Sequence, residues 1–285
     1  MAENATRTVE LSAGALEYVD TGGPGPVVVL VHGLLFDEAV WTEVVALLRE
    51  DFRVLVPVLP LGAHRRPVRP VPGRPLSAHT VAGLLGEFLE RLNLDDVTLV
   101  QNDVGIAQLL VGTAYEERIG RLVLTSCEAL DNHPPGLQGR LLVEAARMPG
   151  GLFALLQGFR LPALARLPFA LGGMTRRPLP DGLIRRWYRP VLTDPAVRAD
   201  LRAFLRATEA HTYREAGERL RSFPRPVLVA WGALDRMMPP DTGRRLAALC
   251  PRGEFVTVPG ARTLVPWDNP KALALAVRAF ASRAD

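Results

Sequence analysis

A carboxylate stands at a sharp corner in the segment VTLVQNDVGIAQLL, residues 97–110. Residues 97–100 are typical of a buried strand, and the spacing of the apolar residues that follow predicts a helix over 103–115. Such a corner lifts the Asp103 side chain above the sheet, and the positive end of the helix favours its ionised form. A shielded carboxylate can attack carbon or act as a base. The alternative is that Asp103, or Asn102, only caps the helix.

Two other segments place polar residues just after predicted strands. VHGLLFDEAVW, residues 31–41, begins at the end of an early apolar run. WGALDRMMPP, residues 231–240, does so late in the chain and carries Asp235 in a turn. Sites in open α/β sheets lie where the strands end, so these two segments are the candidates to join Asp103.

The elements that must position these residues alternate along the first half of the chain. The first 23 residues alternate apolar and polar positions around a turn at 12–14, which predicts an antiparallel hairpin. Buried strands are predicted for PVVVLVHG, FRVLVPV, 97–100 and 121–125. Helices are predicted over 38–50, 77–92 and 103–115. The repeated strand–helix–strand units predict a parallel, doubly wound α/β sheet with helices on both faces.

The middle of the chain breaks this pattern. Between about Asp131 and Phe223 no convincing strand occurs, and Pro and Gly divide the sequence into short helical pieces. The sheet pattern then resumes with a strand at 226–232, a helix at 240–249, a strand at 254–258 and a helix at 270–282. We therefore predict an α/β core in two parts, 1–130 and 223–285, and a helical cap insertion at 131–222.

The order and spacing of the three polar segments resemble the α/β-hydrolase superfamily, and the resemblance covers nearly the whole chain. It implies a mostly parallel eight-stranded sheet with an inserted cap. It also places Asp103 at the nucleophile elbow, as in the haloalkane dehalogenase and epoxide hydrolase branches. Asp235 falls where the catalytic acid often lies, and the backbone N–H groups of Leu34 and Val104 would form the oxyanion hole. Gln101 departs from the pattern, because the elbow usually has a small residue there.

The histidine that such hydrolases use as a base is missing. The family's loop resembles PGAGHF, whereas this chain reads PGARTLVPWDNP, with Arg262 and Thr263 at the Gly and His positions. No histidine occurs after His211. General-base help is worth roughly 10²–10⁴ in rate, so an ester formed at Asp103 would hydrolyse slowly. His64, which is predicted to lie at the same edge of the sheet, is the candidate substitute.

Two further alternatives concern the acid. Glu128 and Asp131 lie just past the strand at 121–125 and could replace Asp235, as in some branches of the family. Without a histidine to orient, Asp235 could instead pair with Arg262 as a structural ion pair.

Several residues are candidates for the walls of a substrate pocket. They follow strands, lie near the oxyanion turn or supply apolar surface in the cap: His32, Phe36, Trp41, Asn102, Cys127, His133, Phe153, Trp187 and Thr263. For His32 a structural role beneath the turn is the favoured interpretation. For Phe36 and Trp41 core packing is the alternative, and for Cys127 an inert buried thiol is.

Composition narrows the class of protein. The 34 basic and 30 acidic residues give a net charge of +4 and are spread along 285 residues, so we expect no nucleic-acid partner. Two cysteines do not make a disulfide framework, and no motif for a metal or a nucleotide cofactor occurs. The polar N-terminus and the absence of a long apolar run predict a cytoplasmic protein without membrane contact. A homodimer is compatible with the sequence.

These observations favour an enzyme for a small, mainly apolar organic molecule, such as a specialised metabolite, that needs no cofactor. Because the histidine is missing, a non-hydrolytic cyclisation, elimination, isomerisation or rearrangement assisted by Asp103 is favoured over hydrolysis. The first alternative is a hydrolase of esters, epoxides or halides that forms an aspartyl ester at Asp103. The second is a ligand-binding protein without catalysis.

Overall fold

One mixed sheet organises the protein in the computed structural model, which describes residues 6–69 and 74–283. The strand order is β1-β2-β4-β3-β5-β6-β7-β8. The strands are β1 Thr6–Leu11, β2 Gly14–Asp20, β3 Val27–Val31, β4 Arg53–Pro57, β5 Val97–Asp103, β6 Ile119–Cys127, β7 Val227–Gly232 and β8 Gly253–Val258. The β1–β2 hairpin joins β4 antiparallel, and the other neighbouring strands are parallel. The eight-stranded, mostly parallel sheet is therefore confirmed.

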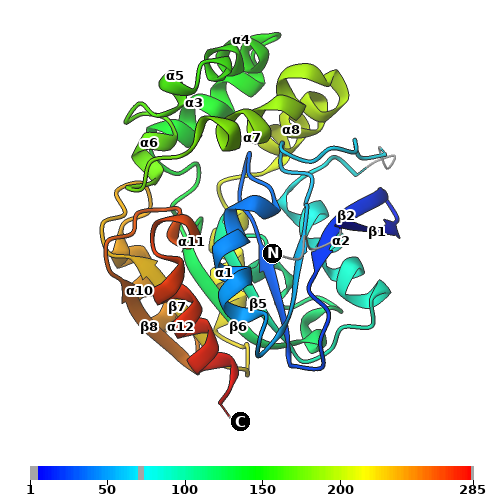
Figure 1. The fold of residues 1–285 in the computed structure, drawn as a ribbon, viewed down its shortest axis with the longest axis vertical. Helices are drawn as coiled ribbons and strands as arrows, with labels where there is room; N and C mark the ends of the chain where they lie inside the picture. Colours follow the sequence, from blue (N-terminus) through cyan, green and yellow to red (C-terminus); the bar gives the residue numbers. More distant parts are fainter. Residues whose placement is uncertain (1–5, 70–73, 284–285) are drawn as a thin grey trace.

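Helices cover both faces of this sheet (Figure 1). On one face lie α1 Thr42–Leu48, preceded by the 3-10 helix η1 Glu38–Trp41, with α11 Val265–Asp268 and α12 Pro270–Ala281. On the other face lie α2 Ala78–Arg91 and α10 Pro240–Leu249. The Ser77 hydroxyl accepts the Thr80 N–H at 3.3 Å, which caps α2 at the predicted residue. Strands β5, β6 and β7 are buried along their whole length, as expected for central parallel strands.

The chain between β6 and β7 is helical. Its elements are α3 Gly136–Arg147, α4 Gly151–Gln157, η4 Gly158–Arg160, α5 Pro162–Ala165, α6 Leu171–Met174, α7 Asp181–Thr193, α8 Pro195–Ala207 and α9 Thr212–Leu220. Helices α3 to α8 lie together above one end of the sheet (Figure 1). Helix α9, which falls inside the predicted cap, contacts α10 and the short helix after β5. The boundaries at 131 and 222 stay a prediction.

The predicted helix over 103–115 is wrong. Strand β5 continues to Asp103, and only the 3-10 helices η2 Ala107–Leu110 and η3 Glu116–Arg118 follow. Gly112 adopts a φ of +79°, which ends helical geometry there. The side-chain oxygen of Gln101 accepts the Ala107 N–H at 2.6 Å, so a side chain rather than a helical carbonyl satisfies this donor. Asp103 therefore lies at a corner that leads into a loop.

Among the described residues no helix is long and apolar enough to cross a membrane.

Candidate active site

Asp103 ends β5 in a conformation that non-glycine residues seldom adopt. Its φ is +70°, in the left-handed region. Its side chain lies against Gly33, where an added Cβ would come within 2.3 Å of the Asp103 Oδ2 atom. The Leu34 N–H donates to that same oxygen at 2.9 Å. Because the donor belongs to another segment of the chain, Asp103 does not cap a helix, and the elbow presents the carboxyl group to the turn after β3.

Two residues keep this corner tight in different ways: Gly105 leaves space for a close contact, and Gln101 binds the neighbouring segments. A Cβ on Gly105 would lie 2.4 Å from the carbonyl oxygen of Glu128, so only glycine fits. Gln101 occupies the position where the resemblance predicts a small residue. Its amide donates to the Cys127 sulfur at 3.1 Å and accepts from Ala107, so the larger side chain ties the corner to β6 and to the following loop.

The charge state of Asp103 differs from the prediction. Burial raises its pKa to about 8, and the charges of Glu128 and Asp235 add to this effect. The Leu34 N–H lowers the pKa but does not outweigh burial. No α-helix begins at the corner to favour a negative charge, so the expected ionised form is wrong. Near neutral pH, Asp103 is a carboxylic acid that can donate a proton.

Asp235 lies in a second corner, where hydrogen bonds occupy one oxygen of its carboxylate and the other oxygen has no hydrogen-bond partner among the described residues. Its Oδ1 accepts the N–H groups of Met237 and Met238, each at 3.0 Å. The same oxygen accepts the Thr263 hydroxyl at 2.8 Å. Burial raises the pKa of Asp235 to about 6. Thr263 thus fills the place of the missing histidine as a donor to the acid, and it supplies no base.

Arg262 does not pair with Asp235, so this alternative is wrong. Its guanidinium Nη1 donates to the carbonyl oxygens of Gly172 at 2.9 Å and Thr175 at 3.4 Å. Its backbone N–H donates to Asp268 at 2.8 Å. The long cationic side chain reaches unsatisfied carbonyls in the insertion, so Arg262 ties the loop after β8 to the helical cap.

Glu128 and His133 form a buried ion pair just after β6. The His133 Nδ1 lies 2.9 Å from the Glu128 Oε1. Burial opposes the charged imidazolium, but the charge of Glu128, its hydrogen bond and the Thr208 backbone together raise the pKa of His133 above its usual value. Both side chains face the same cavity as Asp103. Glu128, which was predicted as an alternative to Asp235 as the acid, therefore lines the cavity beside Asp103, whereas Asp235 does not.

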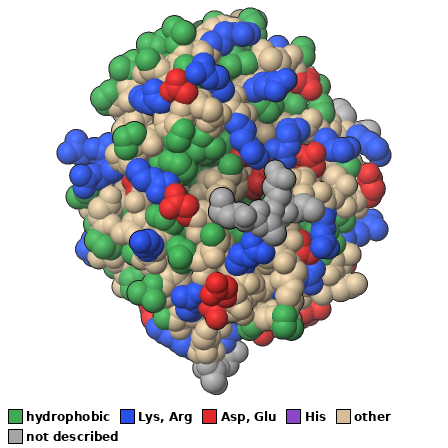
Figure 2. All heavy atoms as spheres, viewed as in Figure 1, with side chains coloured by type: hydrophobic (Ala, Val, Ile, Leu, Met, Phe, Trp, Pro, Cys, Tyr) green, Lys and Arg blue, Asp and Glu red, His purple; other side chains and the backbone are tan. Residues whose placement is uncertain are grey.

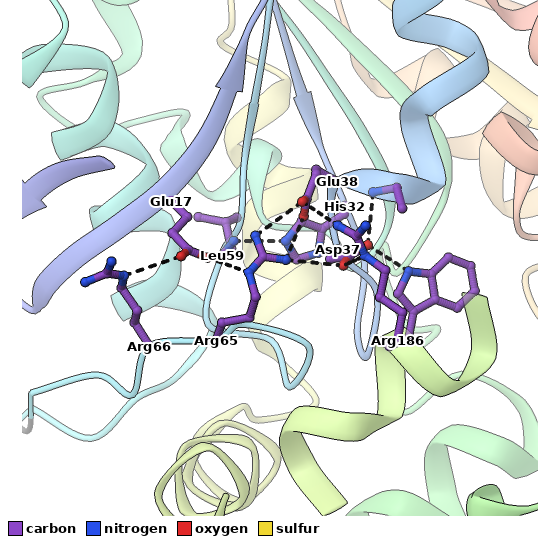
Figure 3. Close-up of polar contacts among 10 residues, drawn as sticks. Glu17, His32, Asp37, Glu38, Leu59, Arg65, Arg66 and Arg186 are labelled. Carbon is purple, nitrogen blue, oxygen red and sulfur yellow. Dashed lines mark hydrogen bonds and ion pairs between the residues drawn. The ribbon is translucent and has the colours of Figure 1, made fainter. Parts of the chain in front are cut away.

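His32 lies beneath the turn at Gly33 and Leu34, which we call the oxyanion turn because it carries the predicted donor Leu34. Its Nδ1 donates to the Gly33 carbonyl at 2.9 Å, and its Nε2 accepts the Leu59 N–H at 2.9 Å. Figure 3 shows the bond between His32 and Leu59 beneath a group of charged side chains. Burial lowers the pKa of His32, so the ring is neutral, as this pair of bonds requires. The structural interpretation fits this geometry.

His64 is placed away from the cavity. Its Nε2 lies 3.1 Å from the Asp200 Oδ2, and its Nδ1 accepts the Gly62 N–H at 3.2 Å. Both ring nitrogens are thus engaged between a loop and α8, and the ring does not line the cavity of Asp103. The prediction that His64 replaces the missing base is therefore wrong on geometric grounds.

A cavity of about 330 Å³ lies between the sheet edge and the cap. Asp103, Glu128 and His133 supply polar groups in its wall, and leucine, phenylalanine, proline and methionine side chains supply most of the rest. Leu34, Phe36 and Val104 line it as well, so the two predicted oxyanion residues lie beside Asp103. This size is within the common range for small-molecule sites.

The cavity reaches the surface through apolar side chains of the cap. Leu141, Leu164 and Phe169 belong to its wall and are exposed by 44%, 42% and 56%. In Figure 2 hydrophobic side chains are frequent over the cap, at the top of the view. Exposed apolar groups around an opening are typical of a site that admits apolar ligands.

Seven residues predicted for the substrate pocket do not line it: His32, Trp41, Asn102, Cys127, Phe153, Trp187 and Thr263. Trp41 is fully buried in the core, and Cys127 is a buried thiol whose pKa is raised by burial. Phe153 is half exposed beneath the Arg198 guanidinium. Trp187 packs edge-on against Phe36, with ring centroids 4.8 Å apart. The presence of an aromatic side chain was therefore not enough to predict whether a residue lines the cavity or packs in the core.

Asn102 connects the two acidic corners. Its amide nitrogen donates to the Thr263 carbonyl at 2.8 Å and also to the Thr125 side chain and backbone on β6. A residue beside the elbow thereby holds the loop that carries Thr263. Its role is structural, because its donor capacity is used inside the protein.

Charged residues join the oxyanion turn to the cap (Figure 3). Asp37 is buried and accepts the Trp187 indole N–H at 2.8 Å and the Arg186 guanidinium at 2.6 Å, both from α7. Glu38 binds Arg186 at 2.6 Å and Arg65 at 3.2 Å. Helix α7 is therefore fixed to the turn that carries the Leu34 N–H.

Comparison with known proteins agrees with this architecture. A model of the alpha/beta hydrolase family matches residues 28–277. The chain is 26% identical over 263 residues to a 2-hydroxy-6-oxononadienedioate/2-hydroxy-6-oxononatrienedioate hydrolase from Cupriavidus pinatubonensis, covering 89% of this chain and 86% of that protein. It is 27% identical over 281 residues to haloalkane dehalogenase 2 from Mycobacterium bovis, covering 95% and 93%.

A solved structure shows the same fold. An alpha/beta hydrolase fold protein from Burkholderia ambifaria matches with a TM-score of 0.77 and 24% identity, over 97% of this chain and 98% of that chain. The family model spans most of the sequence, and the relatives are enzymes. This chain therefore belongs to the alpha/beta hydrolase family and is an enzyme of that superfamily.

Proposed function

We propose that this enzyme transforms a small, largely apolar organic molecule by proton transfer without hydrolysis. Elimination, isomerisation, cyclisation and related rearrangements belong to this class. The observation that carries the proposal is the pairing of Thr263 with Asp235, which leaves the loop after β8 without the histidine base that usually hydrolyses an aspartyl ester.

The state of Asp103 supports the same conclusion. With a pKa of about 8, its carboxyl group is mostly protonated near neutral pH, and a protonated carboxyl is a poor nucleophile. A carboxylic acid in an apolar site can donate a hydrogen bond or a proton to a developing enolate or phenolate oxygen. The backbone N–H groups of Leu34 and Val104 are the proposed further donors to that oxygen.

The walls of the cavity support an apolar substrate. Apart from the polar groups of Asp103, Glu128, His133 and Tyr188, the surface offers mainly hydrocarbon contacts. A strongly charged substrate would lose its hydration there without finding a free opposite charge, because Glu128 and His133 already bind each other. A neutral molecule with one or two oxygen atoms fits this distribution best.

The second candidate is a hydrolase that forms an ester at Asp103. It is favoured by the similarity to haloalkane dehalogenase 2 and to a dienedioate hydrolase. That candidate requires an ionised Asp103 and a base near the ester. Asp103 is mostly protonated near neutral pH, and Thr263 stands where the usual histidine base would be, so hydrolysis is the second choice.

Two probes separate the candidates. Ring opening of 5-nitrobenzisoxazole reports proton abstraction in an apolar site, and bromide release from 1-bromohexane reports attack by Asp103. We expect saturable, repeated turnover of the benzisoxazole, reduced about 10-fold in Asp103→Asn because the acid is lost. We expect no repeated bromide release.

The opposite pattern would overturn the proposal. Bromide release over many turnovers, with a hexyl adduct on Asp103 in the intact mass, assigns the protein to the hydrolases. Absence of benzisoxazole turnover in a correctly folded wild-type protein also contradicts proton-transfer chemistry.

A further inference from the structure

We propose that Glu128 is the base that takes the substrate's proton, with Asp103 as the acid and His133 as a positioning residue for Glu128. This inference rests on the proposed function and deepens it, since it names the second catalytic residue. The resemblance to known hydrolases suggested Glu128 only as a partner for a histidine on the loop after β8, and that loop carries Thr263.

The fold holds the two carboxyl groups in a fixed relation. Strands β5 and β6 are parallel neighbours, and the Glu128 N–H donates to the Asp103 carbonyl at 2.7 Å. The Glu128 carbonyl in turn accepts the Gln108 side-chain amide at 2.6 Å. Both side chains then enter the same cavity, where one substrate can contact them together. Groups on rigid strand ends keep the alignment that proton transfer needs.

The groups around the two carboxyl groups indicate which one is the acid and which one is the base. Two carboxyl groups facing one mainly apolar cavity do not both ionise readily, so one of them keeps a proton. His133 lies 2.9 Å from Glu128, and its raised pKa favours a positive charge on that side. Asp103 has only the neutral Leu34 N–H as a donor among the described residues. The negative charge is therefore favoured on Glu128 and the proton on Asp103.

His133 acts through Glu128. Its Nδ1 is bound to the carboxylate, and the Thr208 backbone also raises its pKa. The other ionisable group packed against it is Tyr213 of α9, whose ring centroid is 5.2 Å away. Burial and the charge of Glu128 raise the pKa of Tyr213, so the phenol stays neutral. The pair Glu128–His133 is thus the charged couple facing Asp103.

The proposed reaction requires only the substrate, the two carboxyl groups and solvent. Glu128 takes a proton from carbon, and the electron pair of that C–H bond forms a new double bond. In an elimination the C–O bond breaks, its electron pair stays on oxygen, and Asp103 protonates that oxygen. Water or an alcohol leaves. The proton on Glu128 then returns to Asp103 through solvent, which restores the starting state.

Variants of Glu128 test the inference with 5-nitrobenzisoxazole as substrate. In this reaction a base removes the ring C–H proton, its electron pair completes a nitrile, and the N–O bond breaks to give a phenolate. We expect Glu128→Gln to lose at least about 100-fold in kcat, within the range for removal of a general base. Glu128→Asp should restore part of the loss. Glu144→Gln, the same change at an exposed residue of α3, is the matched control.

The pH dependence of the wild type gives a readout that a structural role would not produce. If Asp103 is the acid, the rate falls as the pH rises through about 8, where Asp103 loses its proton. His133→Gln should lower kcat less than Glu128→Gln does, because the base remains in place but loses the hydrogen bond that positions it.

The outcomes distinguish this inference from the proposed function. A rate that rises through pH 8, abolished in Asp103→Asn and retained in Glu128→Gln, makes Asp103 the base and overturns the inference alone. Unchanged turnover in both variants contradicts both proposals. Circular dichroism of each variant shows whether a loss reflects misfolding, and partial rescue in Glu128→Asp keeps the test valid if Glu128→Gln is unstable.

Discussion

Two acidic corners lie at the carboxyl ends of parallel strands in this protein, and they differ in how their carboxyl groups are satisfied. Asp235, after β7, gives one oxygen to two backbone N–H groups and the Thr263 hydroxyl. Asp103, at the end of β5, receives one backbone N–H and faces the cavity. Both are buried acids, so residue type alone does not distinguish them. Their surroundings distinguish them, because Asp103 lines the cavity and Asp235 does not.

The neighbouring charges sharpen the contrast. Burial raises both pKa values, to about 6 for Asp235 and to about 8 for Asp103. Hydrogen bonds hold the pKa of Asp235 down, whereas the charge of Glu128 pushes that of Asp103 up. Under our proposal, the corner that corresponds to the usual acid and base is structural in this chain, and Asp103 and Glu128 at the elbow provide the acid and the base.

The largest expected effect comes from closing the elbow. Gly33→Ala would place a methyl group 2.3 Å from the Asp103 Oδ2, where the neighbouring backbone cannot yield easily. We expect turnover of the benzisoxazole to fall by more than about 100-fold, because small displacements of reacting groups are costly. Gly83→Ala is the control, since nothing lies within 4 Å of its Cβ position. A fully active Gly33→Ala protein would contradict the tight elbow.

Removing a donor from the other corner should change stability and leave catalysis nearly intact. Thr263→Val keeps the shape but removes the Thr263 hydroxyl that donates to Asp235. We expect the free energy of unfolding to fall by about 1–3 kcal/mol, the usual cost of a lost bond to a buried polar group. Turnover should change by less than about threefold. Urea denaturation and steady-state kinetics check both values, and a 100-fold loss of turnover would return Asp235 and Thr263 to the catalytic site.

Asp103→Asn should stabilise the protein in a pH-dependent way. The folded state holds the Asp103 proton up to about pH 8, whereas the unfolded chain releases it near 3.8. Between these values the folded state binds more protons, so its stability falls as the pH rises. The asparagine variant lacks this penalty, so its stability relative to the wild type should rise by roughly 3–4 kcal/mol between pH 5 and pH 8. A pH-independent difference in urea denaturation would count against the raised pKa.

The smallest effect is expected at the ion pairs between α7 and the oxyanion turn. Arg186 is nearly half exposed, and Asp37 keeps its bonds to Trp187 and Ala39 without it. Arg186→Gln should therefore cost less than about 1 kcal/mol at low salt. The cost should shrink further in about 0.5 M NaCl, because salt screens exposed charges. A loss of more than about 2 kcal/mol in the free energy of unfolding would contradict this prediction and show that these ion pairs are needed to hold the cap in place.

Local pattern was enough to predict most of the architecture. Continuous apolar runs marked the central strands, Ser77 marked the start of α2, and frequent Pro and Gly marked the helical insertion. The helix over 103–115 was predicted wrongly because a side chain satisfies the Ala107 N–H there. Gln101 makes that bond from the preceding strand, and such a contact is invisible to periodicity.

The site was only partly predictable for a similar reason. The order of motifs located Asp103, Leu34 and Val104, because these positions depend on strand ends. The charge on Asp103 depends on burial and on Glu128, two features that only the folded chain brings together. His64 and His133 looked similar as loop histidines, and the structure places one against Asp200 and the other in the cavity.

The central claim is that Asp103 is a protonated acid near neutral pH, and carboxyl NMR tests it most directly. Protein labelled with ¹³C at aspartate carboxyl groups can be titrated between about pH 4 and pH 10, with Asp103→Asn identifying the signal. The account predicts a titration midpoint near pH 8 for Asp103. A midpoint at or below about pH 4, the ordinary range for aspartate, would contradict it.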